Sequence, residues 1–239
     1  MKITNCTWEL NNLGCKVAEI DCTKDAVIDS SKVDEIEQIY DYVVVKVPIL
    51  KPQLNLFWSQ RQYMCIEAQL SIKVKLEELK NQMGLLENLG SLHTLLVDSV
   101  KDLAILQTKM TELMFTTDRI YLDPSFGPTY SLNRYRNWIS NEYHRGTKIY
   151  KILNDEKWVG FFMPKENDGT MDGLLGGLFS DFQGEGLGIV LPFMPLLVNS
   201  NARKYETKIS LNNFPVIQVY NQCGYRFTNI EYVFVKHTK

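Results

Sequence analysis

The chain has 239 residues, of which 45% are hydrophobic and 23% are charged, and its formal net charge is −2. This length and composition fit a globular protein built from one large domain or two small ones. Because the charges nearly balance, nothing favours nucleic acid or an acidic membrane surface as a partner.

The cysteines and histidines argue against both a disulfide framework and a metal centre. The five cysteines are scattered without paired spacing, and the three histidines are dispersed. We therefore expect reduced thiols and no metal. The N-terminus lacks the apolar core of a signal peptide, and the longest apolar run, residues 189–198, is too short to span a membrane. The sequence predicts a cytoplasmic protein with no membrane partner.

The first third of the chain predicts a small α/β unit. Residues 8–22 read as a hairpin-like start that ends in an alternating strand. An amphipathic helix follows, with Ser30 or Ser31 as its cap. The later elements expected in this unit are a strand at 42–49, a helix at 54–63 and a strand at 64–76. The resulting order is β-α-β-α-β.

The segment that follows contains the expected domain boundary. Residues 77–90 fit a helix poorly because of Gly84 and Gly90, whereas residues 98–114 carry a clear helical pattern. We place the boundary near residues 90–100, which divides the chain into domains 1–95 and 96–239.

The second domain is expected to alternate between strands and helices after a turn-rich loop. The predicted elements are a loop at 117–128, a helix at 132–142, a hairpin at 147–163, strands at 171–180, 205–211 and 229–237, and a helix beginning at Asn213.

A glycine-rich turn stands out in this domain. Gly184, Gly186 and Gly188 follow an apolar run and precede another. A strand, a glycine turn and a helix together point backbone N–H groups at one spot, which suits a phosphate or pyrophosphate. Pro192 and Pro195 fall in the expected helix, so either that helix is short or its register differs.

A second segment, residues 213–225, reads as a short helix with recognisable ends. Asn213 is the expected N-cap, Pro215 lies in the first turn, and Gly224 follows the last turn. Asn213 and Tyr220 are two turns apart, so they are expected on one side of the helix.

Together these segments resemble the GNAT superfamily of acyl-CoA-dependent N-acyltransferases. Gln183-x-x-Gly186-x-Gly188 is similar to its pyrophosphate-binding signature, and residues 213–225 are similar to its second conserved block. The segments around Trp8, residues 118–126 and Tyr135-x-x-Trp138 resemble the branch that includes dTDP-fucosamine acetyltransferase.

The resemblance implies an α+β fold with a mixed, mostly antiparallel sheet flanked by helices. It also implies that residues 1–95 form a smaller, degenerate GNAT-like domain. The implied activity is transfer of an acyl group from acetyl-CoA, as co-substrate, to the primary amine of a small molecule. A nucleotide-linked amino sugar is one such acceptor.

The resemblance also assigns roles to residues. Those implied for the CoA molecule are Leu178, Phe179, Ser180, Gln183, Gly184, Gly186, Leu187, Gly188, Asn213 and Tyr220. Tyr220 occupies the position of the general acid, where an ordinary phenol has a pKa near ~10. The loop holds Asp181 and Glu185 and no basic residue, so its phosphate contacts would come from the backbone.

The acceptor side is less defined. The residues that the resemblance places near an acceptor are Arg119, Asp123, Arg134 and Trp138. Candidates for a general base, by residue type alone, are Asp172, Glu142, His144 and Glu231. The sequence selects none of these four.

Three readings of the function stay open. Besides the small-molecule acceptor, the acceptor could be a protein N-terminus, a polyamine or an antibiotic amine. A third alternative is a catalytically silent acyl-CoA-binding protein on the same scaffold. The sequence does not fix the oligomeric state, and a homodimer remains one of the alternatives.

Overall fold

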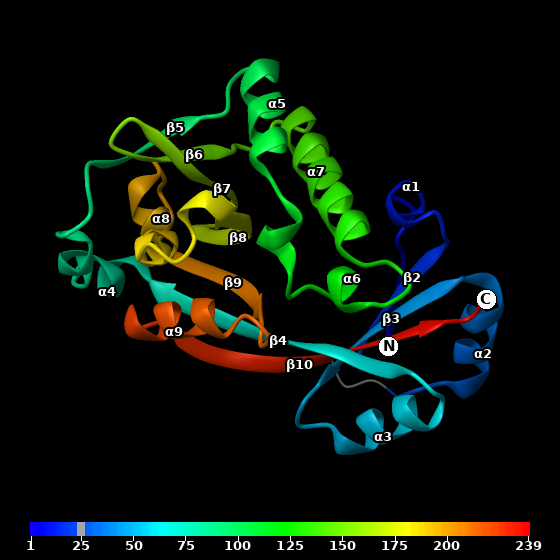
Figure 1. The fold of residues 1–239 in the computed structure, drawn as a ribbon. Helices are drawn as coiled ribbons and strands as arrows, with labels where there is room; N and C mark the ends of the chain where they lie inside the picture. Colours follow the sequence, from blue (N-terminus) through cyan, green and yellow to red (C-terminus); the bar gives the residue numbers. More distant parts are fainter. Residues whose placement is uncertain (23–26) are drawn as a thin grey trace.

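A mixed sheet of ten strands runs through the computed structural model, which describes residues 1–22 and 27–239 (Figure 1). The strand order is β1-β2-β3-β10-β4-β9-β8-β7-β6-β5. The strands are β1 (Lys2–Asn5), β2 (Val17–Asp21), β3 (Tyr42–Pro48), β4 (Met64–Lys75), β5 (Leu92–Leu96), β6 (Tyr150–Asn154), β7 (Lys157–Asn167), β8 (Thr170–Leu178), β9 (Lys204–Ser210) and β10 (Arg226–His237). Only β2–β3 and β8–β9 pair in parallel among these neighbours, so the expected mixed, mostly antiparallel sheet is confirmed.

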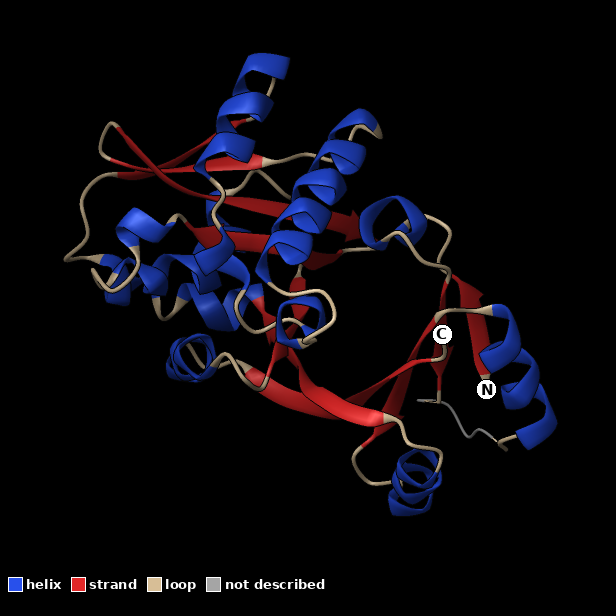
Figure 2. Cartoon of the chain, turned by 45° about the vertical axis from the view of Figure 1, so that its right-hand side comes forward, coloured by secondary structure: helices blue, strands red, loops and turns tan. Residues whose placement is uncertain are grey.

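Helices cover both faces of this sheet (Figures 1 and 2). The α-helices are α1 (Glu9–Leu13), α2 (Ser30–Ile39), α3 (Pro52–Gln60), α4 (Leu76–Lys80), α5 (Val100–Lys109), α6 (Arg119–Leu122), α7 (Pro128–His144), α8 (Val190–Leu197) and α9 (Phe214–Gln222). Short 3₁₀ segments occur at Met83–Leu86, Glu112–Phe115, Ser180–Phe182 and Leu187–Ile189.

Two similar units make up most of the sheet. In the first unit, residues 17–75, the order is β2-α2-β3-α3-β4; in the second unit, residues 170–237, it is β8-α8-β9-α9-β10. Each unit begins with a parallel pair of strands. The last strands are exchanged: β10 lies beside β3, and β4 lies beside β9. The proposed boundary near residue 95 therefore separates segments whose strands interleave.

The core has separate parts on the two sides of the sheet. Around the second unit, α8 and α9 pack on one face, while α5 and α7 pack on the other. Around the first unit, α2 and α3 pack on one face, while α1 and α6 cover the opposite one. A sheet buried on both faces explains why β3 reads as a continuous β-branched run rather than an alternating one.

Several local expectations need correction. Residues 9–13 form the helix α1 instead of part of a hairpin, so β1 and β2 pair across a helical connection. The cap of α2 is Asp29, whose carboxylate accepts hydrogen bonds from the N–H groups of Ser31 and Lys32. The turn-rich loop at 117–128 contains the short helix α6, capped by Asp118. The carboxylate that caps α2 thus lies one residue before the expected serines, and a capping carboxylate in the expected loop begins α6.

The part of the chain described by the structure contains no helix that is long and apolar enough to cross a membrane.

Candidate active site

The parallel pair β8–β9 separates partway along its length. Its register ends at Gly173 and Thr207, although β8 continues to Leu178 and β9 to Ser210. The Thr207 hydroxyl donates to the Gly173 carbonyl oxygen at 2.7 Å, which satisfies that carbonyl with a side chain. Beyond this point the edge of β8 that faces β9 has no strand partner, so an opening forms between the strands.

The glycine-rich turn begins where β8 ends. Gly184 and Gly186 have φ angles of +84° and +79°, values that glycine adopts without strain. The Gln183 side-chain amide donates to the Leu178 carbonyl oxygen at 3.3 Å, and Thr111 and Ser180 share a hydrogen bond between their hydroxyls. Two side-chain hydrogen bonds thus hold the start of the turn. A Cβ atom built at either glycine, or at Gly188, would meet no atom within 4 Å, so the surface of the turn is open.

The helix after the turn accommodates both of its prolines because it is short. It has eight residues, Val190–Leu197, preceded by the 3₁₀ segment Leu187–Ile189. Pro192 lies in the first helical turn, where a missing N–H breaks no bond, while Pro195 lies inside the helix. The Tyr225 hydroxyl donates to the Pro192 carbonyl oxygen at 2.6 Å. The helix is therefore short, and the register of the turn is as expected.

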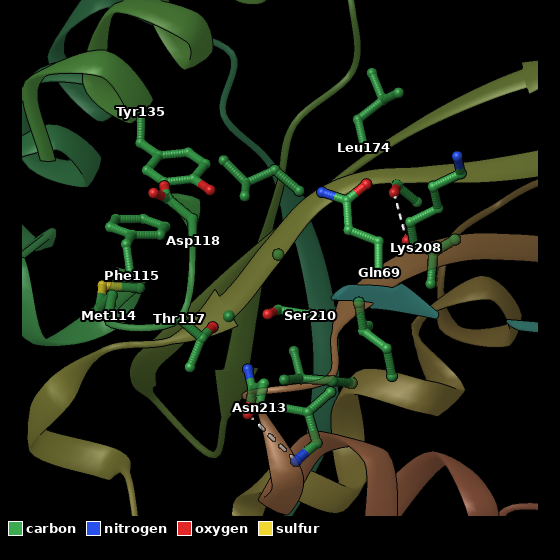
Figure 3. Close-up of a pocket in the computed structure, with 18 of the residues that line it drawn as sticks. Gln69, Met114, Phe115, Thr117, Asp118, Tyr135, Leu174, Lys208, Ser210 and Asn213 are labelled. Atoms are coloured by element: carbon green, nitrogen blue, oxygen red, sulfur yellow. Dashed lines mark hydrogen bonds between the residues drawn. The ribbon is translucent and has the colours of Figure 1, made fainter. Parts of the chain in front are cut away.

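A cavity of about 240 Å³ lies at the base of the opening (Figure 3). Its lining comes from four parts of the chain: Glu67 and Gln69 on β4; Met114, Phe115, Thr117, Asp118, Arg119 and Tyr135 around α6 and α7; Phe162 and residues 173–177 on β7 and β8; and Leu191, Tyr205, residues 207–210, Asn213, Val216 and Tyr220. Because the lining includes residues from both faces of the sheet, the cavity passes through the opening.

Tyr220 lies in the cavity wall, and its side chain is buried. It is 6% exposed, its hydroxyl hydrogen-bonds to that of Tyr205, and its ring packs edge-on against Tyr225 at 4.7 Å. Burial, followed by the neighbouring Tyr205 and Tyr225, raises the pKa of Tyr220 well above its ordinary value. The assumption of an ordinary pKa near 10 was therefore wrong, and Tyr220 keeps its proton at neutral pH.

Asn213 also lines the cavity, on the same side of α9 as Tyr220. Its side-chain oxygen accepts a hydrogen bond from the Val216 N–H at 3.4 Å, which caps α9. Gly224 follows the helix with a φ of +78°. The helix ends are where the sequence predicted them.

The remaining residues assigned to CoA lie around the turn. The Leu178 and Phe179 side chains are buried in the two core clusters on opposite faces of the sheet. Gln183, Gly184 and Gly186 are exposed, and Leu187 is buried beneath the turn. Asp181 and Glu185 are also exposed, and the glycines beside them leave the backbone open.

Of the residues assigned to the acceptor, Arg119 lines the cavity, whereas Arg134 and Trp138 are absent from its described lining. Arg119 Nη2 and Arg134 Nε donate to Glu9 Oε1 at 3.1 and 2.9 Å, so both guanidinium groups share one carboxylate that is 1% exposed. Arg134 also lies over the Trp8 ring, 4.7 Å from its centroid. Glu9 therefore connects α1 with α6 and α7.

Trp138 and Asp123 have contacts away from the cavity. The Trp138 ring packs against the core cluster between α5 and α7. Asp123 is 1% exposed and lies 2.9 Å from the Nε2 atom of His237 at the end of β10. Asp123 thus connects the loop after α6 to the last strand.

The four candidates for a general base also lie outside the described cavity lining. Glu142 accepts hydrogen bonds from Arg145 and Thr147, and His144 is exposed at the end of α7. Glu231 is buried in an ion pair with Lys208 at 2.8 Å. Asp172 precedes the opening on β8, beside Glu206.

Sequence reasoning missed the acidic end of the cavity. Glu67 is 6% exposed, and its Oε1 atom accepts a hydrogen bond from Gln69 Nε2 at 2.9 Å. Asp118 lies across the cavity beside Tyr135 (Figure 3). Glu67 belongs to β4, in the first unit, and the sequence held no local signal that this strand would border the second unit.

No group of three or more histidine, cysteine, aspartate or glutamate side chains within residues 1–22 and 27–239 is arranged to bind a metal ion.

Searches by sequence find no matching family model and no matching curated protein. Comparison of structures does find proteins of similar structure. A conserved protein of unknown function from Staphylococcus epidermidis ATCC 12228 superposes with a TM-score of 0.62 at 16% identity, over 93% of this chain and 84% of that one. A GCN5-related N-acetyltransferase from Kribbella flavida gives 0.55 at 11% identity, over 92% and 81%.

A tandem GNAT protein from the clavulanic acid biosynthesis pathway gives a TM-score of 0.52 at 12% identity, over 93% of this chain and 75% of that one. At identities this low, the superpositions establish a shared fold and nothing about function. With its two β-α-β-α-β units and its separated parallel strands, the chain has the fold of the GCN5-related N-acetyltransferases.

Proposed function

We propose that this protein is an acyl-CoA-dependent N-acyltransferase that uses acetyl-CoA to acylate the primary amine of a small molecule. The observation that carries the proposal is the opening between β8 and β9, with a glycine turn at its outer end and a cavity at its base. Each part matches one portion of an acyl-CoA molecule.

The free edge of β8 suits the pantetheine arm. Residues 175–178 pair with β7 on one side, and they have no strand partner on the other side among the described residues. Unpaired backbone N–H and C=O groups bind an extended, amide-containing chain as they would bind another strand. Pantetheine has two amides, so it can add to this edge.

The glycine turn suits the pyrophosphate. Its glycines leave the backbone accessible, and the segment leads directly into the 3₁₀ turn and the start of α8. Backbone N–H groups at such a position favour an anion. Asp181 and Glu185 are the charged side chains of this segment, so binding through the backbone predicts modest affinity.

The reaction needs a partner for the departing sulfur. The amine nitrogen forms a bond to the thioester carbonyl carbon, the carbon–sulfur bond breaks, and the sulfur leaves as a thiolate that gains a proton. Tyr220 holds its proton and lies in the cavity wall with Tyr205, so it can stabilise the developing charge on sulfur by hydrogen bonding. Its raised pKa favours this stabilisation over complete proton donation.

The nucleotide-linked amino sugar is a narrower proposal with less support. It rests on Arg119, Arg134 and Trp138, of which Arg119 lies in the cavity wall. We therefore propose a primary amine as the acceptor, without naming the molecule that carries it.

A thiol-release assay with acetyl-CoA and a panel of primary amines tests the proposed activity. We expect turnover with at least one amine, and a fall in kcat of roughly 100-fold for Tyr220→Phe. Tyr143→Phe, on α7 and outside the described cavity lining, is the matched control and should keep its activity. Binding of acetyl-CoA without turnover of any amine would instead support a catalytically silent acyl-CoA-binding protein.

A further inference from the structure

Glu67 is the feature of the cavity that the proposed reaction leaves without a role. It projects from β4 on the same face as Gln69, opposite to the face that carries the buried Leu70. Gln69 donates to Glu67, and Ser210 on β9 also hydrogen-bonds to it. A buried carboxyl with two such neutral partners has room for a further donor.

Arg119, the guanidinium that acts on Glu67, is paired elsewhere through Nη2, and its Nε is a buried donor with no hydrogen-bond partner among the described residues. Arg119 Nη2 pairs with Glu9, which also binds Arg134, so Glu9 holds two cations. No Arg119–Glu67 ion pair occurs within 4 Å in the described part of the chain, although the two side chains line one cavity. Arg119 therefore influences Glu67 through space without occupying its oxygens.

The two other charged groups of the cavity, Asp118 and Lys208, have partners of their own. Asp118 accepts hydrogen bonds from the N–H groups of Ile120 and Tyr121 and from the Ser131 hydroxyl, at 2.6, 2.9 and 3.0 Å. Lys208 Nζ pairs with Glu231 at 2.8 Å. Glu67 is therefore the cavity carboxyl with capacity to bind a new donor.

An aromatic wall lies in the same part of the cavity. Phe115 and Tyr135 are stacked, with ring centroids 4.0 Å apart and planes at 17°, and Figure 3 shows them across the cavity from Gln69. Each ring covers one face of the other, so the pair forms an apolar boundary, and the desolvated carboxylate of Glu67 is the group that attracts a cation. A cavity of about 240 Å³ leaves space for a compact group between them.

We propose that Glu67 accepts the proton of the acceptor's ammonium group, and that the acceptor is a compact organic cation. This inference rests on the proposed acyl transfer. The ammonium proton moves to a Glu67 oxygen, the freed nitrogen lone pair attacks the thioester carbon, and the carbon–sulfur bond breaks. The thiolate takes up the second proton lost by the nitrogen, and Glu67 later returns its proton to water.

The surroundings of Glu67 support this cycle. Burial raises its pKa, Asp118 acts in the same direction, and Arg119, Gln69 and Ser210 oppose the rise. Tyr135 and Cys65 are the other titratable groups that interact with it, and both remain protonated at neutral pH. A carboxyl with a raised pKa is a better proton acceptor than an ordinary one, and a bound ammonium would favour its ionised form.

The raised pKa of Glu67 makes the folded protein less stable as the pH rises. The folded protein binds the Glu67 proton more tightly than the unfolded chain does, so stability falls as the pH rises from the unfolded pKa through the folded one. Glu67→Gln removes this loss. Urea unfolding should show the variant gaining stability over the wild type as the pH rises from 4 to 8 (about the range of carboxyl titration).

The decisive experiment measures binding of propylamine hydrochloride, a compact cation, to the full chain saturated with desulfo-CoA. We expect saturable binding that weakens about tenfold in Glu67→Gln. Glutamate-labelled ¹³C NMR should show the Glu67 pKa falling on binding. Glu206→Gln is the matched control, because Glu206 is a carboxyl on β9 with a raised pKa that lies outside the described lining.

Two results would overturn the inference: equal propylamine binding by wild type and Glu67→Gln, or no propylamine binding at millimolar concentration. Glu67→Asp retains the carboxyl and should recover part of the affinity. In all variants the binding of acetyl-CoA should be unchanged. If acetyl-CoA itself fails to bind the wild type, the failure belongs to the proposed acyltransferase function and is distinguishable from these two results.

Discussion

Gly173 and Tyr205 lie beside the point at which β8 and β9 separate. A Cβ atom at position 173 would collide with the Tyr205 hydroxyl oxygen, so glycine there makes room for that hydroxyl. Tyr205 is 2% exposed and hydrogen-bonds to Tyr220. Gly173 is therefore required to seat the pair of tyrosines at the base of the cavity.

Replacing this glycine should strain the base of the cavity. Gly173→Ala forces Tyr205 from its position, and overpacking of this kind costs about 1–3 kcal/mol. Urea denaturation measures the loss. Gly177→Ala is the matched control on the same strand, because its Cβ would meet only Met114 Cε at 3.6 Å, an ordinary contact. Equal stability of the two variants would refute this role of Gly173.

The sequence predicted which residues line the cavity better than it predicted how buried those residues are. The cavity side of Asn213 and Tyr220 followed from helical spacing, which is local. The burial of Tyr220 depends on Tyr205 and Tyr225, which reach it through tertiary packing. Glu67 was missed for the same reason, because its role depends on a strand pairing across more than 130 residues.

At the scale of elements, local signals gave most of the correct boundaries. The ends of α9 were predicted from Asn213, Pro215 and Gly224, and the structure has all three in their expected positions. By contrast α1 was missed, because a five-residue helix has too few turns to show a period.

Asn213 should contribute to stability through its cap. Asn213→Ala removes the hydrogen bond to the Val216 N–H and is expected to cost about 1 kcal/mol, since caps of this type contribute that much. Asn213→Asp keeps a capping oxygen and should retain most of the stability. Thermal unfolding of both variants separates these outcomes, and an alanine variant as stable as the wild type would show that the cap is dispensable.

At the scale of the whole molecule, the exchanged strands join the two units. β4 lies between β10 and β9, so each unit contributes a strand to the sheet of the other. The sequence predicted both units and most of their strands but not this exchange, because strand order depends on non-local pairing. The two-domain description therefore gives the chain order correctly while leaving out how the halves are joined.

Interleaved strands predict that the two units unfold together. Trp58 reports on the N-terminal part, and Trp138 and Trp158 report on the C-terminal part. Single-tryptophan variants should give coincident urea transitions, which should also match the loss of circular dichroism. Separate midpoints for the two parts would contradict the exchange of β4 and β10.

Calorimetric titration with acetyl-CoA tests the central claim, that the glycine turn and the opening beside it bind acyl-CoA. Gly186→Asp adds a carboxylate to the turn without a steric clash, so it should abolish binding by repelling the pyrophosphate. Gly146→Asp introduces the same charge at a glycine of similar φ, beyond α7, and should bind like the wild type. Saturable binding lost only in Gly186→Asp is the predicted result; no binding by the wild type, or equal binding by both variants, would contradict it.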